Sequence, residues 1–293
     1  MNIYINEESI LHIETLIVGL PEHINQLREI KYNNQSINEQ LETLKQHHII
    51  GSSVGKISST MFYTNNQPKR LLTVGLGNLK DLSYQRLLKV WGHTFQFLKQ
   101  EHINEAEVLL DTFISKYNDS IEVAKTFGLQ SNQSIYQFDN YKSDKKAPYQ
   151  PNIYVQTEFD KVNSAIYEGQ QLGKSINLAR ELSQMPPNIL TPQYFAEEID
   201  NHFKESGVSV HIKDAETLVS EGFGLLHAVG KGSVNGPRLI TMTYNGGKAN
   251  DAPIALVGKG ITYDTGEYTI KSKVGMNTIQ LEISVAPKLQ AKL

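Results

Sequence analysis

The first half of the sequence repeats an apolar strand, a glycine turn and an amphipathic helix, and this repeat narrows the choice of fold. Residues 69–77 form an apolar run that ends in glycines, and residues 79–100 carry leucines and aromatic residues at helical spacing. Further strands are predicted over 107–112 and 135–139, with a helix over 120–129 between them. Strands that alternate with helices are typical of an α/β domain with a mixed or mostly parallel sheet.

The glycines at 75–77 close one of these strands and resemble the start of a dinucleotide-binding turn. A dinucleotide fingerprint has the spacing G-x-G-x-x-G, and the third glycine is absent here. The residues therefore favour a tight turn between a strand and a helix.

The end of the first domain is predicted where the composition changes. Residues 140–156 are polar and basic and contain prolines, which interrupt both helices and sheets. A helix with an apolar stripe is predicted over 160–184, and it ends at a pair of prolines. We therefore expect an N-terminal α/β domain over residues 1–152, a linker helix over 153–185 and a second domain over 186–293.

Charge and composition exclude several classes of partner. The net charge of −3 and the lack of a basic stripe argue against binding to nucleic acid. The chain has no cysteine, which excludes disulfides and thiolate chemistry and suits a reducing cytoplasm. No apolar stretch is long enough to cross a bilayer, and the N-terminus has no signal-peptide pattern. We therefore expect a cytoplasmic protein without a membrane partner.

The stretch with the most chemical content is residues 256–271, in which an apolar run and a glycine turn are followed by charged residues. Lys259, Asp264 and Lys271 place two cations around one carboxylate. A lysine binds a metal only as the free amine, and an aspartate can bridge two divalent ions. Two other readings stay open. The turn resembles a phosphate loop without the required spacing, and a plain strand-turn-strand with solvated lysines would have the same residues.

Three segments in the second half of the sequence carry a family resemblance. They are INLARELSQMPPNILTPQYFAEEI at 176–199, GFGLLHAVGKGSVNGPRLITMTYNG at 222–246 and LVGKGITYDTGEYTIKSKVGM at 256–276. In this order they resemble the leucyl aminopeptidase (cytosol aminopeptidase) family. The resemblance implies an N-terminal α/β (macro-like) domain, a linking helix and an α/β metallopeptidase domain, which is incomplete in this chain.

The resemblance also implies roles for individual residues. Lys259 and Asp264 match metal ligands, with Asp264 touching both ions, and Lys271 matches the catalytic lysine beside the scissile carbonyl. Glu282 stands at the position of a further aspartate ligand. The family uses two divalent ions, manganese or zinc, and a bridging water to release amino acids, leucine preferentially, from peptide N-termini. It assembles as hexamers.

Departures from the family pattern change what we expect of this chain. Glu267 replaces a glycine, and the later segment N-T-D-A-E-G-R, which supplies an aspartate, a glutamate and an arginine in the family, has no equivalent before the last residue, Leu293. We therefore expect a truncated or degenerate member that binds at most one ion weakly, has little or no peptidase activity and forms a lower oligomer or aggregates. The alternative is a non-catalytic protein whose N-terminal domain serves in assembly or ligand binding.

Overall fold

The structure is a computed structural model, and it describes residues 1–7, 13–26, 29–32, 35–64, 67–248, 252–263 and 282–285. The chain divides into two compact units, Met1–Leu178 and Ala179–Leu293. Each unit is described below by itself. Among the described residues, no helix combines the length and the apolar character needed to span a membrane.

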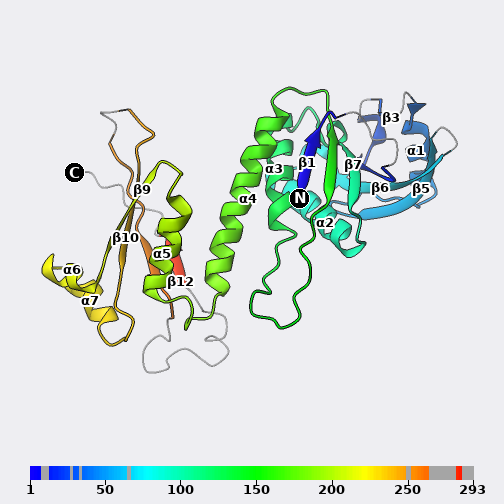
Figure 1. Ribbon diagram of the computed structural model, residues 1–293. Coiled ribbons are helices and arrows are strands. Elements are labelled where there is room, and N and C mark those ends of the chain that lie inside the picture. Colours follow the sequence, from blue (N-terminus) through cyan, green and yellow to red (C-terminus); the bar gives the residue numbers. More distant parts are fainter. Residues whose placement is uncertain are drawn as a thin grey trace. The chain divides into compact units, whose positions relative to one another are not determined.

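The first unit is built on a six-stranded sheet whose strands are all parallel except at one edge (Figure 1). Only β5 runs antiparallel to its neighbour, β6. This arrangement confirms the α/β fold class predicted from the alternation of strands and helices. In spatial order the strands are β1 (Asn2–Ile5), β8 (Asn152–Gln156), β7 (Glu105–Leu109), β2 (Thr15–Pro21), β6 (Gln67–Gly77) and β5 (Ile57–Thr64).

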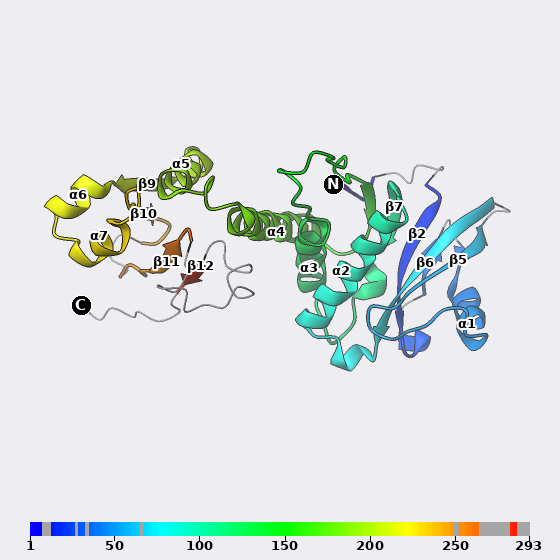
Figure 2. The ribbon, with the colours of Figure 1, turned by 90° about the horizontal axis from the view of Figure 1, so that it is seen from below.

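Helices cover both faces of this sheet, because its central strands are apolar on both sides. All of β2 is buried. On one face lie α2 (Tyr84–Gln100) and α3 (Ser120–Gln133) (Figure 2). Trp91 of α2 and Phe127 of α3 pack there with Phe113, which lies just after β7. On the other face, α1 (Asn38–Gln46) and the segments before it cover Leu16 and Val18 of β2. The short elements of this unit are η1 (Ile24–Gln26), β3 (Lys31–Tyr32), β4 (Gln35–Ser36), η2 (Leu79–Asp81) and η3 (Leu110–Phe113).

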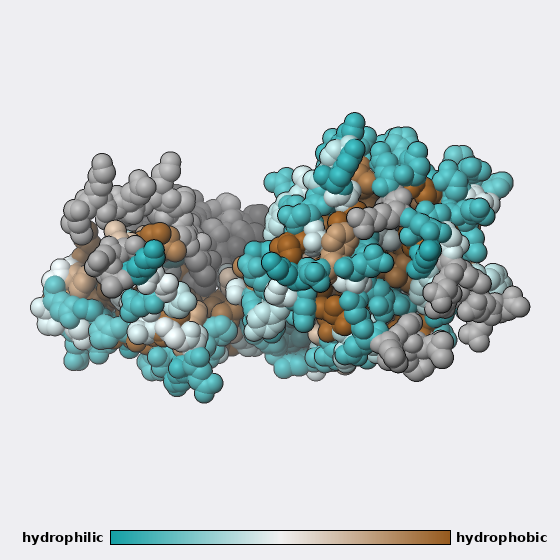
Figure 3. All heavy atoms as spheres, turned by 90° about the horizontal axis from the view of Figure 1, so that it is seen from above, coloured by the Kyte–Doolittle hydropathy of each residue, from teal (hydrophilic) through white to brown (hydrophobic). Residues whose placement is uncertain are grey.

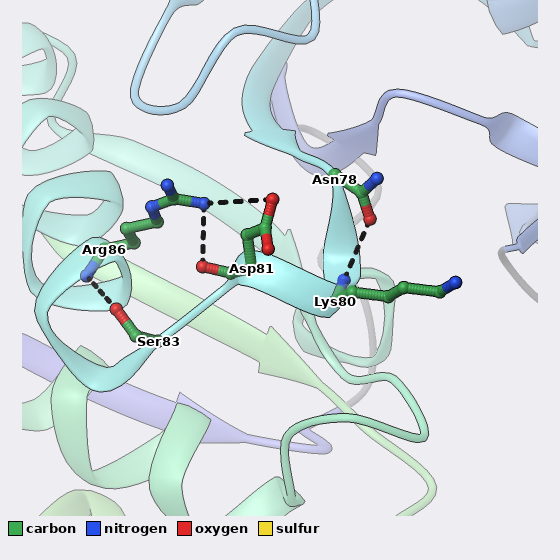
Figure 4. A network of polar contacts seen from close by, with 5 residues as sticks. All are labelled: Asn78, Lys80, Asp81, Ser83 and Arg86. Carbon is green, nitrogen blue, oxygen red and sulfur yellow. Dashed lines mark hydrogen bonds and ion pairs between the residues drawn. The ribbon is translucent and has the colours of Figure 1, made fainter.

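The glycines at 75–77 form the strand-to-helix turn that the incomplete fingerprint favoured. Gly77 ends β6 with φ of 67°, a conformation that favours glycine. A polar network then leads the chain into α2, shown in Figure 4. The Ser83 hydroxyl accepts a hydrogen bond from the Arg86 N–H at 3.4 Å, and the Arg86 guanidinium donates to the Asp81 carbonyl at 2.8 Å. Ser83 is therefore the N-cap of α2.

Two local predictions in the first unit were wrong. Residues 135–139 form no strand, and the strand that completes the sheet is instead β8, inside the proline-containing segment where we expected the domain to end. β8 pairs with both β1 and β7, with Ile153 opposite Ile3 and Ala106. Pro151 lies just before the strand, so the N–H that proline lacks is not needed for strand pairing. Its carbonyl accepts a hydrogen bond from the Asn2 N–H at 3.0 Å.

Helix α4 (Val162–Gln184) confirms the long helix predicted over 160–184 and begins within the first unit. Val162 and Ile166 belong to the core between the sheet, α2 and α3. Glycines let the backbone of α4 pack very close to that of α3. A methyl group on Gly169 of α4 would lie only 2.1 Å from the Lys125 carbonyl oxygen of α3. The first compact unit thus continues to Leu178, beyond the end of the domain expected at residue 152.

The second unit contains short strand pairs and helices. Thr191 caps α5 (Pro192–Phe203) by accepting a hydrogen bond from the Tyr194 N–H at 3.2 Å, and Pro192 begins the helix. β9 (Val208–Lys213) and β10 (Leu239–Tyr244) form one antiparallel pair, and β11 (Gly258–Ile261) and β12 (Glu282–Val285) form another. Between β9 and β10 lie α6 (Ala215–Ser220) and α7 (Gly224–Gly230). Helix α7 lies within the glycine-rich stretch of residues 222–232.

Candidate metal centre

The predicted ligand Lys259 lies on β11, directly after the apolar run 252–257. Its side chain is half-buried, whereas its neighbours Gly258 and Gly260 are exposed. A methyl group on Gly260 would lie 3.7 Å from the ring of Phe195, so β11 passes over α5 at an ordinary contact distance. Helix α5 therefore supports the strand that carries Lys259.

A second predicted ligand position lies on the neighbouring strand. In the antiparallel register of β11 and β12, Lys259 is opposite Ser284 and Ile261 is opposite Glu282. The backbones of Lys259 and Glu282 are therefore two register positions apart in one strand pair. The structure brings these two positions together although twenty-two residues separate them in the sequence, since residues 260–281 lie between.

The other two predicted site residues, Asp264 and Lys271, lie outside the described residues, and their places stay predictions. Within the described part of the chain, no group of three or more His, Cys, Asp or Glu residues could hold a metal ion. One lysine and one glutamate position are too few donors for two divalent ions, which need several carboxylates to hold and neutralise them. The described donors alone do not fit a two-metal centre.

The first unit has a polar groove that the sequence analysis did not identify. The groove has a volume of about 290 Å³ and lies where β1, β7 and β8 end, at the carboxyl edge of the parallel strands. Its polar groups largely satisfy one another. The Asp111 carboxylate accepts from the Thr157 hydroxyl at 2.5 Å and the Glu158 N–H at 2.9 Å, and the Asn6 side chain exchanges two hydrogen bonds with the Thr157 backbone.

The carboxyl edge of parallel strands is a common ligand-binding place in α/β folds. The sequence signal was the position of Asn6, Asp111 and Thr157 just after three strands. That signal was lost because β8 was not predicted.

Family comparisons account for both units. The profile of the "Cytosol aminopeptidase family, N-terminal domain" matches residues 17–145, and that of the "Cytosol aminopeptidase family, catalytic domain" matches residues 177–287. The chain therefore belongs to the cytosol aminopeptidase family, as the three sequence segments indicated. The two matches leave residues 146–176 between them, a range that includes β8 and most of α4.

One curated relative is the "Probable cytosol aminopeptidase" of Pseudomonas syringae pv. tomato, which is 36% identical over 80% of this chain. The match covers 49% of that relative, so the chain spans about half the length of the protein it resembles. Among solved structures, the chain is similar to the bottromycin maturation enzyme BotP in complex with Mn, with a TM-score of 0.71 and 20% identity. That match covers 92% of this chain and 52% of BotP.

A second BotP structure matches with a TM-score of 0.62 at 19% identity and covers 79% of this chain and 46% of BotP. At this level of identity, both structures support the fold alone. Together with the family profiles, they place the second unit in a known α/β architecture.

Proposed function

We propose that this chain carries the lysine-containing part of a metallo-aminopeptidase centre that acts on the free amino termini of peptides. The observation that supports this proposal is the register of β11 and β12, in which Lys259 and Glu282 share one strand pair at the positions predicted to hold metal. Membership of the cytosol aminopeptidase family supports the substrate class, and the name of the relative supports a cytoplasmic location.

The roles of the site residues follow from their chemistry. Lys259 would bind a divalent ion as the neutral amine, and Asp264 and Glu282 would offer carboxylate oxygens to it. The ion would be manganese or zinc, and its contribution would be to act as a Lewis acid. Lys271 would contribute a positive charge beside the carbonyl of the substrate. With so few donors we propose at most one weakly bound ion and little or no hydrolysis by this chain alone.

Titration calorimetry with manganese tests this proposal. We expect one low-affinity binding event that Asp264→Ala abolishes and that Lys259→Ala weakens. Lys231→Ala, which removes an exposed lysine after α7, is the matched control and should leave binding unchanged. No binding by the wild-type chain, or equal loss in the control, would contradict the proposed centre.

Hydrolysis of leucine p-nitroanilide tests the limit on activity. We expect no appreciable turnover, even with excess manganese or zinc. Metal-dependent turnover that disappears in both Lys259→Ala and Lys271→Ala would instead assign full aminopeptidase activity to this chain.

A second candidate function belongs to the first unit, which could serve as a module for assembly or ligand binding. Two observations favour it. The first unit has cores on both faces of its sheet, and its groove lies at the carboxyl edge of the strands. Isolated residues 1–178 should then fold and retain the oligomeric state of the full chain, whereas a change to monomers would assign assembly to the second unit.

A further inference from the structure

Strand β5 forms one edge of the sheet in the first unit, and its outer side has no partner among the described residues. It pairs only with β6 there, from Ile57 opposite Val74 to Thr64 opposite Gln67. In the part of the chain that the structure describes, no backbone group outside this ladder forms a hydrogen bond with the backbone of β5. Every second residue along β5 therefore presents its N–H and C=O groups outward.

The sequence of β5 does nothing to block pairing at this edge. Native proteins commonly protect an edge strand with a charge, a proline or a bulge. β5 reads ISSTMFYT, without a charged residue or a proline, and its register with β6 runs without a shift. Hydrophilic residues cover most of the face of the first unit that Figure 3 shows, which makes an uncharged edge strand unusual for this surface. Such an edge is a template for another strand.

One face of β5 also exposes apolar side chains. Met61 is 55% exposed and Tyr63 is 65% exposed, whereas Phe62 between them is buried in the core on the other face of the sheet. Because side chains alternate across a strand, Ser59, Met61 and Tyr63 share the exposed face. A strand laid beside β5 would cover both apolar side chains and satisfy the backbone groups of the edge.

We propose that β5 pairs antiparallel with β5 of a second copy of this chain, around a twofold axis at Met61, so that two sheets join into one. Self-complementarity selects this occupant. A twofold axis makes a strand its own antiparallel partner, so exposed N–H groups of one copy face C=O groups of the other. Because β5 carries no charge, no like charges meet across the axis.

The place of the axis follows from the exposed side chains. It puts Met61 opposite Met61 of the second copy and Tyr63 opposite Ser59, so the apolar side chains cover one another. The two copies of Lys56, the residue before β5, then lie at opposite ends of the strand pair. An unrelated extended peptide could also add to the edge, but β5 offers no charge that would select its sequence. A single strand pair is smaller than a standard interface, so we expect a weak, micromolar dimer.

The inference rests on the second candidate function, in which the first unit serves in assembly, and it adds the surface and the partner. Sedimentation velocity of the full chain, without added metal, tests it by exchanging charges at the axis. Met61→Lys and Met61→Glu should each weaken dimerisation by about fivefold or more, because each places two like charges face to face. An equal mixture of the two variants should recover the dimer, because opposite charges then meet.

Tyr167 provides the matched control, since it is 63% exposed on α4 of the same unit. Tyr167→Lys and Tyr167→Glu should leave dimerisation unchanged. Circular dichroism of all four variants should match that of the wild-type chain, which separates a lost contact from a lost fold.

The outcomes separate the edge from assembly in general. Recovery in the mixture supports pairing at β5 and identifies the occupant as a second copy. Dimers that neither Met61 variant weakens would overturn the inference and leave assembly to another surface. Weakening without recovery in the mixture would also overturn it, because an axis at Met61 requires opposite charges to restore the pair. A wild-type chain that stays monomeric would contradict both the inference and the assembly function.

Discussion

Replacing Gly169 by alanine should destabilise the first unit, because α3 and α4 touch through their backbones at this point. A methyl group on Gly169 would lie 2.1 Å from the Lys125 carbonyl oxygen and 2.8 Å from the Leu129 nitrogen. The contact is reciprocal, since a methyl group on Gly128 would lie 2.1 Å from the Ile166 carbonyl oxygen. These atoms belong to helix backbones and cannot rotate away, so the two helices must separate.

The expected magnitude comes from two opposing effects. An ordinary carbon–oxygen contact is roughly 3.5 Å, so Gly169→Ala forces the helices apart by about an ångström and loosens the core contacts of Val162 and Ile166. Such overpacking typically costs about 1–3 kcal/mol. Alanine has a better helix propensity than glycine, which raises the free energy of unfolding by about 1 kcal/mol. Because the obstacle is backbone, we expect a net loss of about 2 kcal/mol in the free energy of unfolding.

Urea unfolding followed by tryptophan fluorescence measures this loss. Trp91 is the only tryptophan, and it is fully buried against Phe113 and Phe127, so its signal reports on the first unit. A loss of about 2 kcal/mol should lower the midpoint by roughly 1 M urea. Gly92→Ala in α2 is the matched control, because its methyl group would meet only the flexible Gln130 side chain, whose oxygen would lie 3.3 Å away. Unchanged stability in Gly169→Ala, or equal loss in Gly92→Ala, would refute the reasoning.

Three further predictions concern the first unit. Trypsin should cut first at Lys142, Lys145 or Lys146, which are exposed in a stretch without helix or strand, and first cleavage within α4 would contradict this. Burial lowers the pKa of Lys69 below its ordinary value of 10.5, although Glu107 and Glu14 oppose the shift. Just below pH 10.5, the unfolded chain therefore keeps a proton on Lys69 that the folded chain has lost. The free energy of unfolding should accordingly rise as the pH approaches 10.5 from below. Lys69→Met should remove that rise, and an unchanged slope would exclude Lys69 as its source. Asp119→Ala should cost about 1 kcal/mol, because Asp119 caps α3 by accepting from the Glu122 N–H at 2.8 Å. Asp144→Ala, at an exposed position outside any helix or strand, should be neutral in the same unfolding assay.

The elements that the sequence predicted correctly are those whose burial pattern is local. The apolar run at 69–77 and the helical stripe over 79–100 became β6 and α2, because each contains enough apolar residues to define its own face. The cap of α5 was also predictable, since Thr191 and Pro192 act within one helical turn. These signals do not depend on distant parts of the chain.

The wrong predictions in the first unit involved contacts between distant segments. β8 has only five residues and follows prolines, and its stability comes from the strands on either side, β1 and β7. At 135–139, apolar residues suggested a strand, but Ile135 packs against the core, and its carbonyl accepts from the Lys99 ammonium at 3.1 Å. Apolar character at that position indicated burial rather than strand pairing.

The candidate site was predictable in its residue types and not in its register. The motif at residues 256–271 predicted a lysine and a nearby aspartate as ligands, and the family resemblance added Glu282. Nothing local in the sequence could show that β12 pairs with β11 so that Glu282 lies opposite Ile261, because strand register is set by long-range pairing. The groove of the first unit was missed for the same reason, since it requires three strands to end together.

The contrast between the two units connects stability with the proposed chemistry. In the first unit, the central strand β2 has neighbours on both edges and buried side chains on both faces, so its apolar residues are fully used for folding. In the second unit, β9 and β10 pair only with each other among the described residues, and α5 packs against β9. Hydrophobic stabilisation scales with the apolar area removed from water, so apolar side chains of the second unit that stay in water do not contribute to its stability. Apolar side chains that stay exposed, such as Tyr244 and Leu256, therefore add little to the stability of the unit that carries Lys259.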